Sequence, residues 1–388
     1  MVRALVAGVV VLLGCAPAGP GADADGGMVD GAPDAAADGG PGDAGAVAPA
    51  WQTRVARLAG DGGVEVRFPS GTETVAQLPA VIVGVIRGGF VEVATASRPG
   101  APALDRRTVL PLSSVTKAVT GLMAAREVAD GRLAAATPAS TLLGGDLAPL
   151  VGDRTLVELA SHTAGYLNLP RNLDFMTLPY EPGAAYTRAR LADCLARAEC
   201  SVGAAQRGTY QYSDLGSGLL ALALADGHGG DFEALVAARF TGPLGLSDTR
   251  LRNSADLTRA VSGLTPRGDP VGPASMGVLA GAGGLLSTCD DMLRLLEVLL
   301  RPTPEWRAAV ELAVAPTTGT GAIGWSIDRV RLDGRLVFLK TGEQAGYSTL
   351  LLWSPADDVG LIAFTTVGRS SRTLVGLALE LLEAFRGP

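Results

Sequence analysis

Runs of β-branched and apolar residues lie at both ends of region 51–388, and helix-forming segments lie between them. The first two runs, 81–86 and 90–95, flank Arg87-Gly88-Gly89, which is typical of a hairpin turn. Four further runs lie at 323–330, 336–340, 348–353 and 361–366. Short turns between some of them favour antiparallel pairing.

The segment at about 115–310 is predicted to be mainly helical. Residues 115–130 form a candidate helix ended by Gly131, residues 290–300 form another, and 373–385 have helical apolar spacing. The order predicts an α/β (α+β) fold. We expect an antiparallel sheet from both chain ends, flanked by helices, with an inserted mainly helical subdomain.

The first fifty residues are predicted to lie outside this domain. Arg3 precedes an 11-residue apolar run, which is too short to span a bilayer and ends at Cys15. The Leu-Leu-Gly-Cys sequence resembles a bacterial lipobox, so 1–15 is predicted to be a lipoprotein signal peptide. A plain signal peptide is the alternative. In 16–50, 32 of 35 residues are Gly, Ala, Asp or Pro, which predicts a disordered tether.

Composition excludes several classes of protein. The hydrophobic content of 47% and charged content of 18% are those of a globular chain. The formal net charge of −7 offers no basic field for nucleic acid. Only two histidines and no CxxC motif argue against a metal site or a Ser-His-Asp triad. We therefore expect no cofactor and no metal, and a monomer that touches a membrane only through its lipid anchor.

Cysteine positions fit an exported protein, in which disulfides persist. The lipobox Cys15 would carry the lipid, at a bacterial outer membrane facing the periplasm or the cell surface. Cys194 and Cys200 are six positions apart and either close a small loop or remain free thiols. Cys289 is predicted to be a small buried core residue.

Lysine is nearly absent from this chain. Of 32 basic residues only Lys117 and Lys340 are lysines, which suggests that Lys is kept where Arg cannot substitute. Ser114 lies three residues before Lys117, so both side chains share one helical face. A neutral amine there can accept the proton of a nucleophilic hydroxyl. Residue 337 is Val, so S-x-x-K occurs at no other lysine.

The second lysine opens Lys340-Thr341-Gly342, at the end of a predicted strand. Lys supplies charge, Thr a hydroxyl, and Gly lets the backbone approach a ligand closely. Such a strand can offer main-chain N–H groups to a reacting carbonyl. Tyr212-Ser213-Asp214 lies between the two lysine motifs.

These three motifs, in this order, resemble those of the penicillin-recognising serine hydrolases, in the branch of class C β-lactamases and D-alanyl-D-alanine carboxypeptidases. Further similar segments are 154–165, 240–249, 281–292 and 323–325. The resemblance covers about residues 75–385 and implies a β-lactamase/DD-peptidase-like fold for 51–388.

The resemblance implies an acyl-enzyme on Ser114, which water then hydrolyses. Lys117 and Tyr212 are the candidate general bases, and the backbone N–H groups of Ser114 and Glu343 would form the oxyanion hole. The lysine and threonine of the K-T-G motif commonly receive a substrate carboxylate in this family.

Two residues depart from the family pattern. Asp214 stands where Asn is usual, and we hypothesise that it holds Lys117 charged and shifts the base role toward Tyr212. Glu343 stands where a small residue is usual, and it would weaken carboxylate binding or recognise a substrate amine. His162 falls in a family element where a structural role is expected, and His228 is expected to be exposed.

Three functions remain open on this evidence. The first is an amidase or peptidase acting on β-lactams or D-alanyl peptides, favoured by the K-T-G motif. The second is a carboxylesterase of the same superfamily. The third is a penicillin-binding or sensor module that is acylated without turnover. The substrate, a small molecule or short peptide, would be selected by loops such as 166–186 and 263–280.

Overall fold

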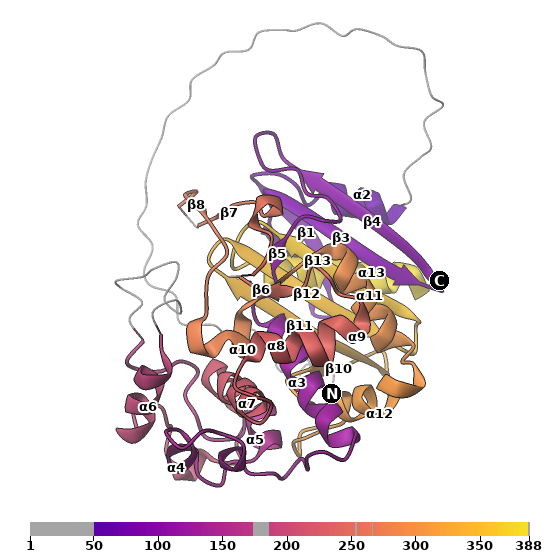
Figure 1. Ribbon diagram of the computed structural model, residues 1–388. Helices are drawn as coiled ribbons and strands as arrows, with labels where there is room; N and C mark the ends of the chain where they lie inside the picture. Colours follow the sequence, from indigo (N-terminus) through magenta and orange to yellow (C-terminus); the bar gives the residue numbers. More distant parts are fainter. Residues whose placement is uncertain (1–49, 174–185, 253, 266, 387–388) are drawn as a thin grey trace, which may run out of the picture.

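The computed structural model describes residues 50–173, 186–252, 254–265 and 267–386 (Figure 1). The predicted signal peptide, with Cys15, and nearly all of the tether lie outside these residues. None of the described helices combines the length and apolarity needed to cross a membrane.

A six-stranded antiparallel sheet joins the two ends of the domain, as predicted. Its strands in spatial order are β10 (Asp328–Leu332), β11 (Arg335–Gln344), β12 (Tyr347–Ser354), β13 (Val359–Thr365), β3 (Ala80–Arg87) and β4 (Phe90–Ser97). The junction is the pairing of β13 with β3, where Ile362 lies opposite Gly84.

The alternation of side chains along β3 sends its residues into two separate cores. Val81, Val83 and Val85 pack in a core with α2 (Ala50–Ala56) and α13 (Ser371–Arg386). Ile82 and Ile86 belong to the larger core shared with the helical part. The sheet therefore separates two layers of helices (Figure 1).

Most remaining helices lie between β4 and β10 in the sequence. They are α3 (Val115–Ala129), α4 (Ala148–Val151), α5 (Leu156–Ala160), α6 (Arg188–Ala196), α7 (Asp214–Asp226), α8 (Phe232–Val236), α9 (Gly242–Leu244), α10 (Ala280–Gly283), α11 (Cys289–Leu300) and α12 (Pro304–Val314). Short strands accompany them: β5 (Leu110–Pro111), β6 (Arg250–Leu251), β7 (Gly263–Leu264), β8 (Pro270–Val271) and β9 (Leu285–Ser287). Buried Cys289 begins α11 and lies next to Gly84 of β3. A Cβ on Gly84 would be only 2.7 Å from Cys289 Sγ.

Two segments differ from the sequence prediction. The strand expected at 323–330 begins only at Asp328, and the preceding residues approach α12 closely, since Trp325 donates its N–H to Ala313 O at 2.8 Å. A further hairpin, β1 (Gly63–Phe68) and β2 (Gly71–Ala76), was not predicted. Most of its residues are exposed or half-buried, so it lacks a continuous apolar run.

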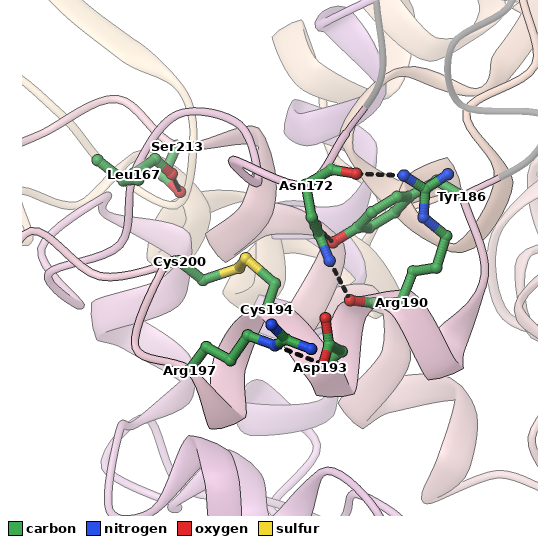
Figure 2. Close-up of a disulfide and its surroundings, with 9 residues drawn as sticks. All are labelled: Leu167, Asn172, Tyr186, Arg190, Asp193, Cys194, Arg197, Cys200 and Ser213. Carbon is green, nitrogen blue, oxygen red and sulfur yellow. Dashed lines mark hydrogen bonds and ion pairs between the residues drawn. A yellow bond between two sulfur atoms is a disulfide. The ribbon is translucent and has the colours of Figure 1, made fainter.

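The structure joins Cys194 and Cys200 by a disulfide at the end of α6 (Figure 2). The carbonyl of Cys200 accepts a hydrogen bond from the N–H of Leu167, at 3.0 Å. The carbonyl of Leu167 in turn accepts one from Ser213 Oγ at 2.6 Å. The disulfide loop is thus connected through one residue, Leu167, to the Tyr212-Ser213-Asp214 motif.

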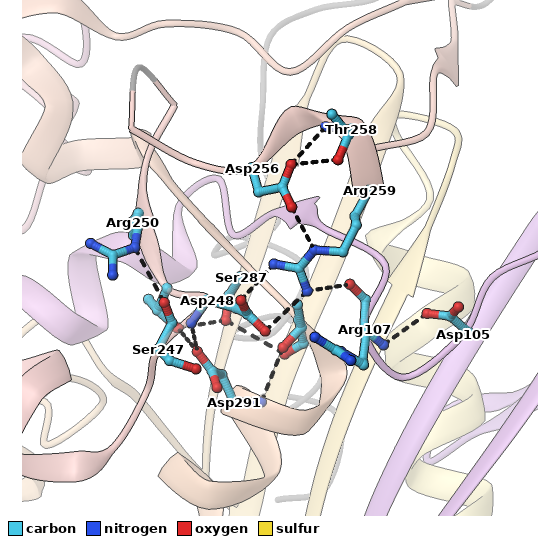
Figure 3. Close-up of polar contacts among 12 residues, drawn as sticks. Asp105, Arg107, Ser247, Asp248, Arg250, Asp256, Thr258, Arg259, Ser287 and Asp291 are labelled. Atoms are coloured by element: carbon cyan, nitrogen blue, oxygen red, sulfur yellow. Dashed lines mark hydrogen bonds and ion pairs between the residues drawn. The ribbon is translucent and has the colours of Figure 1, made fainter.

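Two segments that resemble the family pattern, 240–249 and 281–292, meet at a buried carboxylate. Asp291 Oδ2 accepts hydrogen bonds from Thr249 Oγ1 and from the N–H of Asp248, both at 2.8 Å (Figure 3). Burial raises the pKa of Asp291 despite these donors. This network anchors the start of α11 and explains these two motifs as structural.

Candidate active site

Ser114 lies in a tight turn immediately before α3. Ser113 has a φ of 49°, a left-handed conformation that is unfavourable for a residue with a side chain. Its Oγ accepts a hydrogen bond from Gln344 Nε2 at 2.9 Å, which ties the turn to the end of β11. Ser114 then takes the N-cap position of α3 but makes no capping bond with its side chain. Its hydroxyl is therefore available for chemistry.

The hydroxyl of Ser114 receives two hydrogen bonds from different elements. Lys117 Nζ, on α3, lies 2.9 Å from Ser114 Oγ. The hydroxyl of Tyr212, just before α7, lies 2.8 Å from the same oxygen. The structure thus brings together the three residues that the sequence motifs single out, although 98 positions separate Ser114 from Tyr212.

Lys117 is fully buried, and its ammonium group has further partners. It donates a hydrogen bond to Ala282 O at 2.6 Å and forms an ion pair with Asp214 Oδ1 at 2.8 Å. Asp214 is the first residue of α7, where a carboxylate is favoured by the helix dipole. The expected proximity of Asp214 to Lys117 is therefore present.

The electrostatics of Tyr212 do not favour a phenolate. Burial raises the pKa of Tyr212 well above its ordinary value, and the charge of Asp214 raises it further, against the opposing effect of Lys340. The hypothesis that Asp214 shifts the base role to Tyr212 omitted this contribution, because the carboxylate acts on the phenol as well as on Lys117. Asp214 therefore favours the protonated form of the Tyr212 phenol.

His162 is buried against Tyr212 and has a structural role, as expected. The two ring centroids lie 4.8 Å apart, and His162 Nδ1 accepts the N–H of Ser213 at 3.2 Å. Burial, followed by the charges of Lys340 and Lys117, lowers the pKa of His162 well below its ordinary value. The imidazole is thus neutral at pH 7. His228 is exposed overall, but its side chain is only 22% exposed and its Nε2 lies 3.4 Å from Glu127 Oε2.

Lys340, on β11, also lies next to Tyr212. Its Nζ lies 5.1 Å from the centroid of the Tyr212 ring, and Lys117 Nζ lies 5.0 Å from it. Lys340 Nζ is also 3.4 Å from Oδ2 of Asp328, the first residue of β10. The sequence reasoning missed Asp328, because a single Asp at the start of a strand belongs to no motif. Strand pairing places Asp328 opposite Leu339, so register alone does not predict its contact with Lys340.

Gly342 allows β11 to pass next to the nucleophile. A Cβ at this position would lie 2.3 Å from Leu112 O and 3.2 Å from Ser114 N. Any side chain would push the strand away from Ser114, so glycine is required by space rather than by backbone conformation. The predicted close approach at the K-T-G motif is therefore explained.

Glu343 does not reach the hydroxyl of Ser114. Its carboxylate accepts hydrogen bonds from the N–H of Ser371 at 2.8 Å and from the N–H of Arg369, at the start of α13. The expected effect of this carboxylate on a substrate is not supported by that geometry. Half-buried Thr341 lies two positions earlier on the strand, opposite Leu350 of β12. Strand alternation places it on the same face as Glu343.

No group of three side chains suited to holding a metal ion occurs in the part of the chain that the structure describes. The functional groups gathered around Ser114 and Tyr212 are a hydroxyl, two amines, a phenol and two carboxylates. This set suits proton transfer to and from a serine nucleophile.

Comparison with known proteins gives a consistent family. The sequence pattern of the family described as Beta-lactamase matches residues 72–384. The D-alanyl-D-alanine-carboxypeptidase/endopeptidase AmpH of Escherichia coli K12 is 28% identical over 311 residues, covering 71% of this chain and 75% of that protein.

Solved structures share the fold. A class C β-lactamase from Rhodobacter sphaeroides superimposes with a TM-score of 0.65 at 21% identity, covering 79% of this chain and 95% of that one. A β-lactamase/D-alanine carboxypeptidase from Pseudomonas syringae gives a TM-score of 0.64 at 18% identity, covering 79% and 94%.

The fold and the Ser-Lys-Tyr cluster define the class of serine β-lactamases and penicillin-binding proteins. The chain belongs to the β-lactamase family and is a serine hydrolase of this superfamily.

Proposed function

We propose that the protein hydrolyses amide or ester bonds through an acyl-enzyme on Ser114, in the manner of β-lactamases and D-alanyl-D-alanine carboxypeptidases. The observation that carries this proposal is the pair of hydrogen bonds from Lys117 and Tyr212 to one serine oxygen. The substrate is a small molecule or short peptide.

The protonation states of Lys117 and Tyr212 determine how the nucleophile is activated. When Lys117 and Tyr212 are both protonated, both donate to Ser114 Oγ and neither can accept its proton. Loss of one proton from this coupled pair converts a donor into the general base. The N–H groups of Ser114 and Glu343 are proposed to hold the developing oxyanion, each worth about 3 kcal/mol of barrier. The position of Gly342 against Ser114 N supports this arrangement.

A parallel incubation tests the proposed function. The protein is mixed separately with a fluorescent penicillin, a chromogenic cephalosporin, a D-alanyl-D-alanine peptide and a short-chain nitrophenyl ester, and Ser114→Ala serves as the control. We expect turnover of at least one substrate and a mass increase on Ser114, both lost in Ser114→Ala. If no reaction depends on Ser114, the proposed function is wrong. A stable penicillin adduct without turnover would instead identify a binding or sensor module.

A carboxylesterase is the second candidate, and one observation favours it. Lys117 and Lys340 are each paired with a carboxylate, Asp214 and Asp328. The lysines therefore carry no uncompensated charge with which to attract an anionic substrate. Ester turnover without cephalosporin or peptide turnover would favour this candidate.

We also propose that the protein is exported and anchored by a lipid on Cys15. The signal-like run before Cys15, the tether composition and the disulfide between Cys194 and Cys200 support export. Metabolic labelling with a fatty acid tests it, with Cys15→Ser as control. Label on the wild-type protein alone is expected, and equal absence of label from both would contradict the anchor.

A further inference from the structure

Lys340 differs from Lys117 in how completely its ammonium group is bonded. In the described part of the chain, Lys340 Nζ has a single hydrogen-bond partner, Asp328 Oδ2, at the long distance of 3.4 Å. An ammonium group has three donors. Donors of this buried lysine therefore remain for a ligand, although its side chain is only 4% exposed.

Asp328 shows the complementary deficit. Its side chain is 9% exposed, and among the described residues its Oδ1 is buried without a hydrogen-bond partner. A buried oxygen left without a donor is unfavourable, so such atoms usually mark a site that a ligand or water completes. The pair thus presents spare donors and a spare acceptor side by side, with Lys340 Nζ 5.1 Å from the centroid of the Tyr212 ring.

This arrangement suits one kind of ligand group. A group that both accepts from Lys340 and donates to Asp328 satisfies both deficits, as a carboxamide, a peptide unit or a hydroxyl does. A carboxylate has no proton to donate and would face the carboxylate of Asp328 at short range. Repulsion between like charges is strong where water is scarce.

We infer that Lys340 and Asp328 form a subsite for a neutral carboxamide or hydroxyl group of the substrate, and that Asp328 disfavours substrates with a free carboxylate there. The inference rests on the proposed acyl-enzyme hydrolysis and narrows it toward ester or internal-peptide cleavage, away from a carboxypeptidase preference. It predicts that the acyl donor is an internal peptide or a neutral ester rather than a chain ending in a free carboxylate.

A matched substrate pair tests the inference. N-acetyl-D-alanyl-D-lactate ends in a carboxylate, and its D-lactamide counterpart ends in a carboxamide. Both contain the same ester bond, which a peptidase and an esterase of this class can each cleave. We expect wild-type kcat/KM to be at least about tenfold higher for the lactamide, the scale of one hydrogen bond to a charged group. The difference should lie mainly in KM.

The variant Asp328→Asn assigns the preference to this residue. Removal of the negative charge should lower the lactamide-to-lactate ratio about tenfold or more. Asp333→Asn is the matched control, since it removes one carboxylate that is 91% exposed near the end of β10. That control should leave the ratio within about twofold, as for a screened surface charge.

The outcomes are distinguishable. Equal rates for the two esters, or faster cleavage of the lactate, would overturn the inference while leaving the proposed function standing. An unchanged ratio in Asp328→Asn would overturn the role of Asp328. Absence of Ser114-dependent cleavage of either ester would instead overturn the proposed function, and the inference with it.

Discussion

The two lysines lie at nearly equal distances from the centroid of the Tyr212 ring, 5.0 and 5.1 Å, yet their surroundings differ. Lys117 has three close polar partners, Ser114, Ala282 and Asp214, within 2.6–2.9 Å. Among the described residues, Lys340 has one, at 3.4 Å. A lysine fixed by several partners next to the nucleophile suits proton transfer, whereas a lysine with free donors suits binding. The same residue type therefore serves two functions, and its neighbours decide which.

Lys117→Met should have the largest effect. The substitution removes the amine beside Ser114 at similar volume, so kcat/KM for a cleaved substrate should fall about 1,000-fold, within the usual range for a general base. Lys340→Met should lower it only about tenfold, the loss expected of one charged hydrogen bond. Steady-state kinetics on both variants measure the difference. Equal losses would remove the distinction between the two lysines.

The ion pair of Lys340 and Asp328 should contribute to the free energy of unfolding. Lys340→Met leaves Asp328 buried and unpaired, which should lower the free energy of unfolding by about 3 kcal/mol at pH 7. Burial raises the pKa of Asp328, so the carboxyl is neutral below that pKa and the loss should shrink as pH falls.

Denaturant unfolding measures both effects. The double variant Lys340→Met/Asp328→Leu removes the charge as well as its partner and should recover most of the stability. If the double variant were as unstable as the single one, the pair would matter through packing rather than charge.

The disulfide should contribute less to the free energy of unfolding than the Lys340–Asp328 ion pair. It is connected to the Tyr212-Ser213-Asp214 motif, whose Asp214 is the partner of Lys117. Cys194→Ser/Cys200→Ser releases a loop with a sequence separation of 6, worth about 2 kcal/mol of unfolding free energy. The hydrogen bonds from Leu167 N–H to Cys200 O and from Ser213 Oγ to Leu167 O involve neither sulfur atom and can remain in the folded variant. We therefore expect kcat/KM to stay within about threefold, a change of under 1 kcal/mol. Thermal unfolding and kinetics check this, and a much larger loss of activity would show that the disulfide positions the site.

The smallest expected effect is a shift in pH dependence. Asp214 raises the pKa of Tyr212 and faces the ammonium of Lys117. Asp214→Asn should therefore move the limb where activity rises with pH about one unit toward acid, equal to about 1.4 kcal/mol. Asp328→Asn should move it less, because Asp328 has a weaker effect on Tyr212. The pH dependence of kcat/KM decides, and an unchanged profile in Asp214→Asn would contradict this electrostatic account.

Much of the fold and site could be predicted because local patterns agreed with the long-range arrangement. The antiparallel strands and α3 follow from apolar runs and turns, and Ser114, Lys117 and Tyr212 follow from motif spacing. The role of Gly342 was also apparent, since the motif requires close backbone approach.

The remaining features depend on register and packing, which no local pattern states. Asp328 pairs with Leu339 in the sheet, yet its side chain contacts Lys340, the next residue of β11, at the start of β10. Glu343 turns to α13 because two N–H groups at that helix start need an acceptor. The pKa of Tyr212 is shifted upward because the effect of its burial outweighs the opposing effect of the nearby Lys340 ammonium.

Single-turnover kinetics with a neutral ester test the division between the two lysines most directly, because they separate binding from acylation. Lys117→Met should lower the acylation rate constant at least about 100-fold and leave the apparent dissociation constant within about threefold. Lys340→Met should weaken binding about tenfold and leave the acylation rate within about threefold. Loss of the same parameter in both variants would contradict the account.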